Sequence, residues 1–237
     1  MSINKQLFNL YDKYWEQILV ELSKIDKKLY TNPLLINIDE DAYARADYKV
    51  MIFGQETKGW YDSSGFTDSI IEGMDRYDRF FWQKNFYDGY SKSSFWKKFR
   101  VFQKNILKME KTKDLDIIYM WNNISKIGQP DQETGVDPIT RDLERKYFSV
   151  VAKEIEIIKP DLCIFMTGPN RDHDIKFHFP NIEFKKANDI DSIREMAVIE
   201  CLGIKGLRLY HPSYFGSFNN NYKKRALDAL NEIIKDH

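Results

Sequence analysis

The sequence predicts an α/β fold, a three-layer αβα sandwich with a mostly parallel central sheet of about four core strands. Short apolar runs of the length of buried strands alternate along the chain with segments whose apolar residues recur at helical spacing. No internal repeat, low-complexity tract or linker interrupts this alternation, which favours a single domain over residues 1–237. A sheet of this kind is covered by helices on both faces and binds ligands at the carboxyl ends of its strands.

The first predicted elements are an N-terminal helix and a core strand. Residues 4–27 carry apolar side chains at helical spacing, so they predict an amphipathic helix packed on the domain. Residues 48–53 form a short apolar run stopped by a glycine, which predicts the first core strand. The stretch over residues 55–94 mixes glycine, serine, acids and aromatics, and it predicts a long active-site loop with a helical segment over residues 67–79.

The rest of the chain continues the alternation of helices and strands. The predicted elements are a helix over 95–109, a strand over 115–120, a loop over 126–137, a helix over 147–158, a strand over 161–166, short strands over 182–184 and 197–201, a strand over 207–210 and a helix from 219. A helix followed by a strand indicates a parallel crossover.

The cysteine count excludes several kinds of site. Cys163 and Cys201 are the only cysteines, and both lie in apolar stretches typical of reduced core residues in a cytoplasmic protein. Two cysteines cannot form a disulfide framework, a four-cysteine iron–sulfur cluster or a cysteine-rich zinc site. Residues 172–178 contain acids and histidines that could be drawn as metal ligands, but the local sequence is typical of a solvated loop. We therefore predict neither a metal nor another cofactor.

The charge balance bears on the kind of partner. Basic and acidic residues number 36 each, giving zero net charge, whereas many nucleic-acid-binding proteins are basic. A protein that flips a base out of DNA needs only a local basic rim. Aromatic residues reach 15% and offer rings for a planar ligand, although most must belong to the core. No leader character and no apolar run long enough to span a bilayer occur, so we expect a cytoplasmic monomer without membrane contact.

All four predicted core strands are followed by small or polar residues. They are Gly54-Gln55-Glu56-Thr57 after the first strand, Asn122-Asn123 after the second, residues 167–170 after the third and His211-Pro212-Ser213 after the last. Because the carboxyl ends of parallel strands meet at one edge of a sheet, we expect these residues to converge there. The edge would then present a carboxylate, amides, an imidazole and a hydroxyl.

In this chain order, the segments 52–57, 122–123 and 211–213 resemble the motif set of the uracil-DNA glycosylase superfamily, and the resemblance covers residues 48–236. In that superfamily a Gly-Gln-Asp-Pro or related motif follows the first core strand and supplies a carboxylate and backbone amides, while a His-Pro-Ser motif follows the last. The resemblance implies a uracil-DNA glycosylase-like fold. It also implies a DNA-repair hydrolase that cleaves the N-glycosidic bond of a damaged base, above all uracil, flipped out of DNA.

Glu56 and His211 fit the charges that develop in such a reaction. Cleavage builds positive charge on the sugar and negative charge on the departing base, so the site needs an anion near one and donors near the other. We expect Glu56 to stabilise the oxocarbenium-like sugar and to orient the attacking water. His211, held extended by the proline after it, would donate to a carbonyl oxygen of the leaving base.

The base itself needs a polar edge contact and close approach of the backbone. Asn123, or Asn122 beside it, can offer one donor and one acceptor to the Watson–Crick edge of a flipped pyrimidine. Gly54 leaves room for the backbone to approach the ligand, and Gln55 contributes its main-chain amide.

Aromatic rings near the first strand are candidates for the pocket. Phe66, which follows a glycine, is the predicted ring on which the flipped base stacks. Trp60 and Tyr61 would shape the pocket wall.

The segment after His211 is the predicted DNA contact. Ser213 and Ser217 could contact phosphates, and Tyr214 or Phe215 could fill the gap left by the extruded base. The alternative is that both rings pack under the C-terminal helix.

Two departures from the family pattern lie at the reacting centre. Glutamate stands at position 56 where the best-known branch has aspartate, and Thr57 stands where most branches have proline. The backbone could compensate, the substrate could differ, or catalysis could be lost. Two alternatives therefore stay open: a catalytically silent binder of nucleic acid or a nucleotide, and an enzyme acting on a free nucleoside or small nucleotide.

Overall fold

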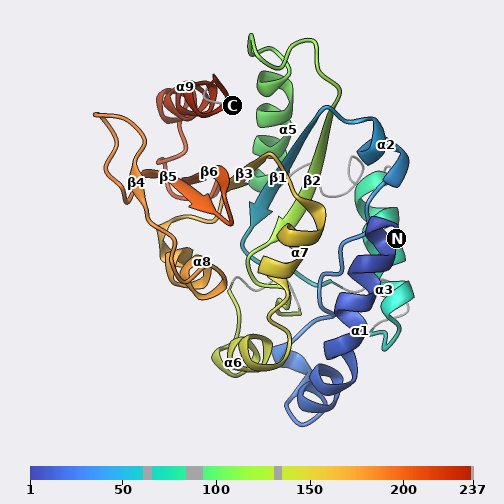
Figure 1. The fold of residues 1–237 in the computed structure, drawn as a ribbon. Coiled ribbons are helices and arrows are strands. Elements are labelled where there is room, and N and C mark those ends of the chain that lie inside the picture. Colours follow the sequence, from blue (N-terminus) through green and yellow to red (C-terminus); the bar gives the residue numbers. More distant parts are fainter. Residues whose placement is uncertain (61–65, 84–92, 131–134, 236–237) are drawn as a thin grey trace. The chain divides into compact units, whose positions relative to one another are not determined.

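The computed structural model describes residues 1–60, 66–83, 93–130 and 135–235, which fall into two compact units (Figure 1). Unit 1 comprises Met1–Glu40, Gln55–Phe86 and Asn122–Ile158, and unit 2 comprises Asp41–Gly54, Tyr87–Trp121 and Lys159–His237. Each unit is thus assembled from three separate stretches of the chain. A single domain over residues 1–237 stays a prediction.

Unit 2 is built around a six-stranded sheet in the order β2-β1-β3-β6-β5-β4. The strands are β1 (Tyr48–Gly54), β2 (Ile117–Asn123), β3 (Leu162–Phe165), β4 (Lys185–Lys186), β5 (Met196–Cys201) and β6 (Ile204–Leu209). All residues of β3 are buried, as are nearly all of β1, which agrees with their unbroken apolar sequences. At Asn122 strand β2 carries the chain into unit 1.

The α/β class is confirmed, but the prediction of about four mostly parallel strands is wrong, because the sheet is mixed and has six strands. Strand β3 is parallel to β1 and to β6, whereas β5 is antiparallel to β6 and to β4. Leu202 and Gly203 join β5 to β6, and their φ angles of 55° and 79° are both positive. Two positive φ angles make the tight turn of a two-residue hairpin, so no crossover helix separates these strands.

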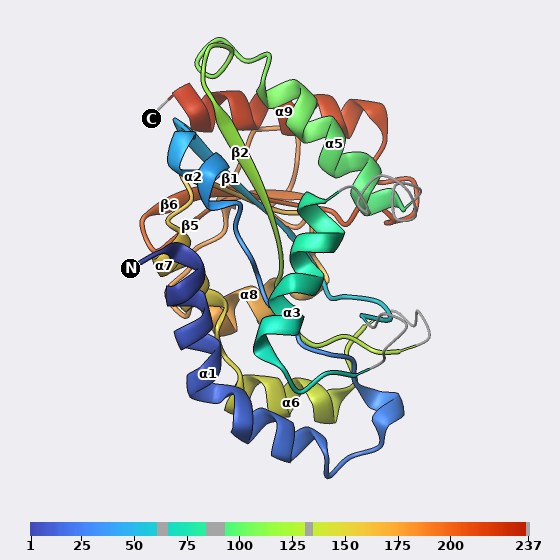
Figure 2. The same cartoon turned by 90° about the vertical axis from the view of Figure 1, so that its right-hand side faces the viewer.

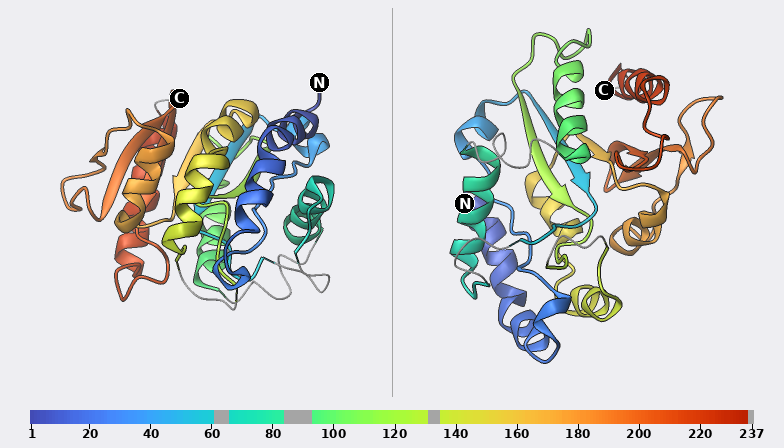
Figure 3. Two further views of the ribbon diagram at one scale, coloured as in Figure 1. Left: turned by 90° about the horizontal axis from the view of Figure 1, so that it is seen from below. Right: turned by 180° about the vertical axis from the view of Figure 1, so that it is seen from behind.

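Helices lie on both faces of this sheet. In unit 2 the helical segments are α2 (Glu40–Arg45), α5 (Ser94–Ile106), η4 (Pro169–Arg171), α8 (Asp172–His178) and α9 (Asn220–Lys235). Helices α5 and α9 lie next to each other on one face, and α8 lies on the opposite face (Figures 2 and 3). Helix α5 buries four large side chains at helical spacing, namely Trp96, Phe99, Phe102 and Ile106. Lys97 and Lys104 on the same helix are exposed.

Unit 1 is mainly helical. Its segments are α1 (Ile3–Leu22), η1 (Lys27–Leu29), α3 (Ile70–Tyr77), the π-helical turn η2 (Asp78–Trp82), α6 (Pro138–Tyr147) and α7 (Val151–Ile158). Helix α1 packs against α3, α6 and α7 through a buried stripe that includes Tyr11 and Trp15. Across the described ranges, no helix is both long enough and apolar enough to cross a bilayer.

Two helix boundaries in unit 1 differ from the prediction. Helix α1 ends at residue 22 rather than 27, because the Asp26 side chain accepts from Lys28 N and starts a separate 3-10 turn. The single helix predicted after the loop over 126–137, carrying residues 147–158, is two helices, α6 and α7. Phe148 interrupts the helix with φ −142°. Its ring is buried, with its centroid 6.2 Å from that of Tyr11 and 6.0 Å from that of Trp15. Aromatic packing thus overrides the helical periodicity.

Candidate functional site

The segment after β1 is held by main-chain hydrogen bonds within unit 1. The Gln55 carbonyl accepts from Ser125 N at 2.9 Å, and Glu56 Oε1 accepts from Gly135 N at 2.8 Å. Both side chains are half-buried. Gly135 has φ 103°, a backbone conformation that favours glycine. The orientation of its amide toward Glu56 therefore depends on glycine at this position. The Glu56 carboxylate is thereby oriented by a backbone amide.

Thr57 lies against the backbone of Gly128. A Cβ atom at Gly128 would stand 1.8 Å from the Thr57 carbonyl oxygen, so no other residue fits there without moving the backbone. The two segments run in parallel, with a β-bridge between Lys58 and Gln129. The Gly128 amide also donates to Thr31 Oγ1 at 3.2 Å. Gly128 was predicted only as part of a loop, yet it fixes the segment that carries Glu56.

Asn122 belongs to a fully buried polar network. Its Nδ2 donates to Glu154 Oε2 at 2.9 Å, and its Oδ1 accepts from Lys126 Nζ at 2.8 Å and from Asn123 N at 2.8 Å. Tyr11 donates its hydroxyl to Glu154 Oε1 at 2.7 Å. The Asn122 amide is thus hydrogen-bonded at both its nitrogen and its oxygen. The neighbouring Asn123 is also buried, with 1% exposure.

Lys126 and Glu154 form an ion pair with no exposure of either side chain, at 2.8 Å. Burial lowers the pKa of Lys126, while Glu154 and Glu144 act in the opposite direction. Burial also raises the pKa of the Tyr11 hydroxyl, followed by the charge of Glu154. This network was missed in the sequence. The available signal was an acid at position 154, on the apolar face of a helix between Val151 and Ile158.

The predicted aromatic residues differ in exposure. Phe66 is 40% exposed, and its ring makes an edge contact with Tyr30 at 5.7 Å between centroids. Trp60 is buried at 6% exposure, and its carbonyl oxygen accepts from Arg76 Nη1 at 3.2 Å. Tyr61 lies outside the described residues. Phe66 is therefore the described ring of this group with a face open to solvent.

His211 lies in unit 2, two residues after the end of β6 at Leu209, and begins a tight turn. Its Nδ1 accepts from Ser213 N at 3.2 Å, and its carbonyl oxygen accepts from Tyr214 N at 2.8 Å. Gly168 after β3 has φ 75°, and a Cβ atom there would stand 3.3 Å from His211 N. Because Nδ1 is an acceptor, a neutral imidazole carries its proton on Nε2. The donor of a neutral His211 ring is then Nε2.

The residues after this turn present an aromatic tip. Phe215 is completely exposed, at 100%. Tyr214 is 40% exposed, and its ring stacks on Tyr210 with centroids 4.9 Å apart and planes 4° from parallel. Packing under the C-terminal helix is therefore wrong for Phe215. Phe218 takes that place, with 7% exposure and its centroid 5.1 Å from the Tyr222 ring.

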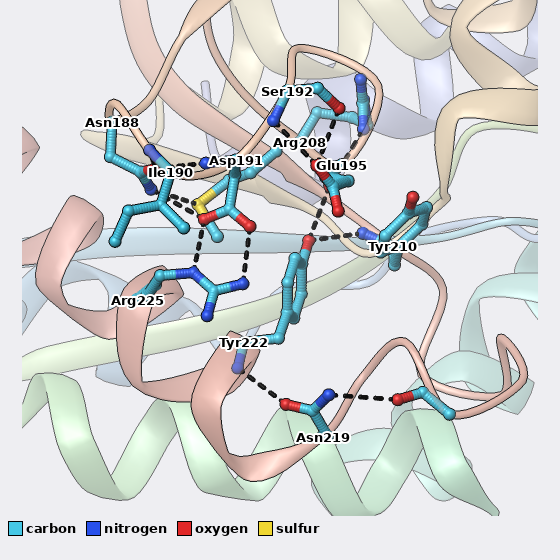
Figure 4. Close-up of polar contacts among 12 residues, drawn as sticks. Asn188, Ile190, Asp191, Ser192, Glu195, Arg208, Tyr210, Asn219, Tyr222 and Arg225 are labelled. Carbon is cyan, nitrogen blue, oxygen red and sulfur yellow. Dashed lines mark hydrogen bonds and ion pairs between the residues drawn. The ribbon is translucent and has the colours of Figure 1, made fainter.

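Tyr222 on α9 ties the two ends of the 210–219 segment together (Figure 4). Its hydroxyl accepts from Tyr210 N at 2.9 Å and donates to the Glu195 carbonyl oxygen at 2.7 Å. Its backbone amide donates to Asn219 Oδ1 at 2.9 Å. Burial raises the pKa of this hydroxyl, so it stays protonated and can donate. Helix α9 therefore holds Tyr210, the residue before His211, through the Tyr222 hydroxyl. The sequence pattern did not reveal this contact.

The predicted site residues divide between the two units. Unit 1 holds Gln55, Glu56, Trp60, Phe66, Asn122 and Asn123, and unit 2 holds Gly54, His211, Ser213, Tyr214, Phe215 and the half-buried Ser217. Within each unit the predicted residues sit on closely connected segments. That both sets act on one ligand stays a prediction.

Residues 172–178 form helix α8, so the reading of this stretch as a solvated loop is wrong. Asp172 Oδ1 pairs with Arg208 Nε at 3.0 Å, and Asp174 Oδ2 pairs with Arg171 at 3.4 Å. Arginine contacts therefore occupy the carboxylates that could be drawn as ligands. Over the ranges that the structure describes, no three His, Cys, Asp or Glu side chains are grouped to hold a metal ion. Cys163 and Cys201 are buried free thiols.

Comparison with models of known protein families and with curated proteins finds no match for this chain.

Proposed function

We propose that the protein is a DNA-glycosylase-like hydrolase that cleaves the N-glycosidic bond of a damaged base, uracil first, flipped out of DNA. One observation carries the proposal: the segment after β6 combines an imidazole whose donor is Nε2 with a fully exposed aromatic ring four residues later. A donor stabilises the charge on a departing base, and an exposed ring can fill the space that the base leaves. The two features are what base extrusion and cleavage need side by side.

The proposed reaction uses two side chains, His211 and Glu56. The C1′–N bond breaks with its electron pair moving to the base, and the His211 Nε2 proton is hydrogen-bonded to a carbonyl oxygen of that base. The role predicted for the Glu56 carboxylate, which accepts from Gly135 N at 2.8 Å, is to stabilise the positive sugar and to orient the water that adds to C1′. The water that adds to C1′ gives up a proton and the departing base takes one up, so the products are the neutral free base and an abasic site. Asn123 is the proposed contact to the base edge, as the sequence predicts, and the Asn122 amide pairs with Glu154 and Lys126.

A gel assay on oligonucleotides containing uracil, with other deaminated bases in parallel, tests the activity. We expect abasic product with at least one of them, and the His211→Ala variant to be about a hundredfold slower in single turnover. The Phe215→Ala variant should lose more activity on duplex than on single-stranded substrate, because only the duplex needs its gap filled. Leu202→Ala is the matched control, since Leu202 is an exposed apolar residue of unit 2 on the β5–β6 hairpin. No abasic product from any base would contradict the proposal.

A second candidate function is binding of nucleic acid or a nucleotide without cleavage. The contact that favours it is the hydrogen bond from Gly135 N to Glu56 Oε1, which gives the carboxylate a structural task. Glu56→Gln separates the two candidates because glutamine keeps the acceptor oxygen and removes the charge. If wild type and variant bind single-stranded DNA equally and neither cleaves, the binding function is supported. Binding of a free nucleotide, in contrast with a polymer, would depend only weakly on salt.

A further inference from the structure

Helix α5 and the start of α9 carry a concentration of positive charge that the whole chain does not have. Helix α5, residues 94–106, contains four Lys and Arg residues and no acid, and residues 220–225 contain three Lys and Arg residues and no acid. Over the whole chain the two signs balance at 36 each. The two helices lie next to each other on one face of the sheet of unit 2 (Figure 2). A neutral protein therefore has a locally basic surface.

Four lysines outside α5 and the start of α9 each form an ion pair with an acid three residues away. The pairs are Lys24 with Glu21 at 2.8 Å, Lys113 with Glu110 at 2.8 Å, Lys153 with Glu156 at 2.7 Å and Lys235 with Glu232 at 2.8 Å. On the basic surface, Lys97, Lys98, Lys104, Lys223 and Lys224 have no ion pair with any described residue. Their charge is thus available to an external anion.

Two of these lysines flank the base of the 211–218 segment. Lys98 Nζ stands 5.4 Å from the centroid of the Phe218 ring, which also contacts Phe102 at 6.4 Å. Burial lowers the pKa of Lys98, and the charge of Lys223 lowers it further, so the two ammonium groups are close enough to repel. Repulsion between like charges is relieved when an anion binds between them. Phe218 is three residues from the exposed tip at Phe215.

We propose that this basic surface, formed by Lys97, Lys98 and Lys104 on α5 and by Lys223 and Lys224 on α9, binds the phosphate backbone of DNA beside the Phe215 tip. A single phosphate would contact only part of this basic surface. Lys97 and Lys104 are separated by about 10 Å along a helix axis, which matches about three nucleotide steps of one DNA strand. The choice of DNA rests on the proposed function, whereas the charge and the position of the surface do not.

Salt dependence of binding to an undamaged duplex oligonucleotide tests the surface without requiring base flipping or cleavage. Each phosphate contact contributes about 0.9 to the slope of log Kobs against log salt. The Lys98→Gln/Lys223→Gln double variant should therefore show a slope shallower by about 1.8. The Lys98→Arg/Lys223→Arg variant keeps both charges and should retain the wild-type slope. Fluorescence anisotropy from 50 to 200 mM salt measures all three proteins.

The matched control is Lys5→Gln/Lys153→Gln in unit 1. Lys5 Nζ lies over the Phe8 ring at 4.7 Å, as Lys98 lies over Phe218, and both control lysines are helical. Its slope should equal that of wild type. An unchanged slope in the Lys98/Lys223 double variant, or no DNA binding by wild type, would overturn the inference. Binding to phosphatidylserine vesicles but not to DNA would overturn it as well. A shallower slope without glycosylase activity would retain this surface and remove the proposed catalysis.

Discussion

Among the residues that the structure describes, each unit holds one cation with no exposed surface, and the two cations are held in different ways. Lys126 in unit 1 and Arg208 in unit 2 both have no exposed surface. Lys126 is surrounded by the side chains of Glu154 and Asn122, which are themselves fully buried. Arg208 instead donates to the carbonyl oxygens of residues 193–195 and pairs with Asp172, whose side chain is 26% exposed.

The difference lies in whether water can replace a lost partner. The network of Lys126 is closed, so each of its groups must keep its protein partner or remain unpaired in a medium of low dielectric constant. The cluster of Arg208 is open on one side, because Asp172 and the 193–195 loop reach solvent. A closed network fixes the segment after β2 rigidly. An open cluster fixes the loop near Tyr222 but tolerates rearrangement.

Removing the cation of the closed network should have the largest effect. Lys126→Met leaves the Glu154 carboxylate buried without its counter-charge, and we expect a loss of about 3 to 5 kcal/mol in the free energy of unfolding. Adding Glu154→Gln removes that charge and keeps an acceptor for Tyr11, so the double variant should be more stable than Lys126→Met alone. Urea unfolding measures both. Lys153→Met, on the exposed side of α7, should change stability by less than about 0.5 kcal/mol.

Arg208→Met should have a smaller effect, about 2 kcal/mol, because water can reach the carbonyl groups and the carboxylate that lose their donor. Hydrogen exchange should at the same time quicken at Tyr210 N, since the Glu195 carbonyl and Tyr222 hydroxyl are held through the same loop. Arg194→Met, at an exposed position of this loop, is the control. A loss as large as that of Lys126→Met would contradict the distinction between closed and open clusters.

The sequence predicts the α/β class and most elements because strands and helices have different periods of apolar residues. Strand β1 was predicted over 48–53 and spans Tyr48–Gly54, since its side chains are buried on both faces. Periodicity does not give strand direction. The antiparallel edge depends on the turn at Leu202 and Gly203, and the break between α6 and α7 depends on where Phe148 finds its aromatic partners.

Candidate site residues could be proposed only at or next to predicted strand ends. Glu56, Asn123 and His211 were proposed because a strand end is visible in the sequence, and their roles stay predictions. The network around Lys126 was not, since Lys126 and Glu154 are 28 residues apart and no periodicity relates them. The same holds for Tyr222, which reaches Tyr210 from another element. Contacts between elements can be identified only from three-dimensional coordinates, whereas the ends of elements can be predicted from the sequence.

The smallest effect is expected at Asp191, which forms an ion pair that is open to solvent on the side of its cation. Asp191 is buried at 1% side-chain exposure, but Arg225, which pairs with it at 2.7 Å, is 27% exposed. The hydrogen bond from Arg225 lowers the pKa of Asp191. The contribution of the ionised Asp191 to stability is therefore complete above the unfolded pKa of about 3.9 and is lost as the pH falls through the lower folded value.

Asp191→Asn should reduce the free energy of unfolding by about 1 kcal/mol at pH 7 and by less at pH 3. Urea unfolding at both pH values measures this difference, with the exposed neighbour Asp189→Asn as the control. An equal loss at both pH values would place Asp191 with the closed network instead.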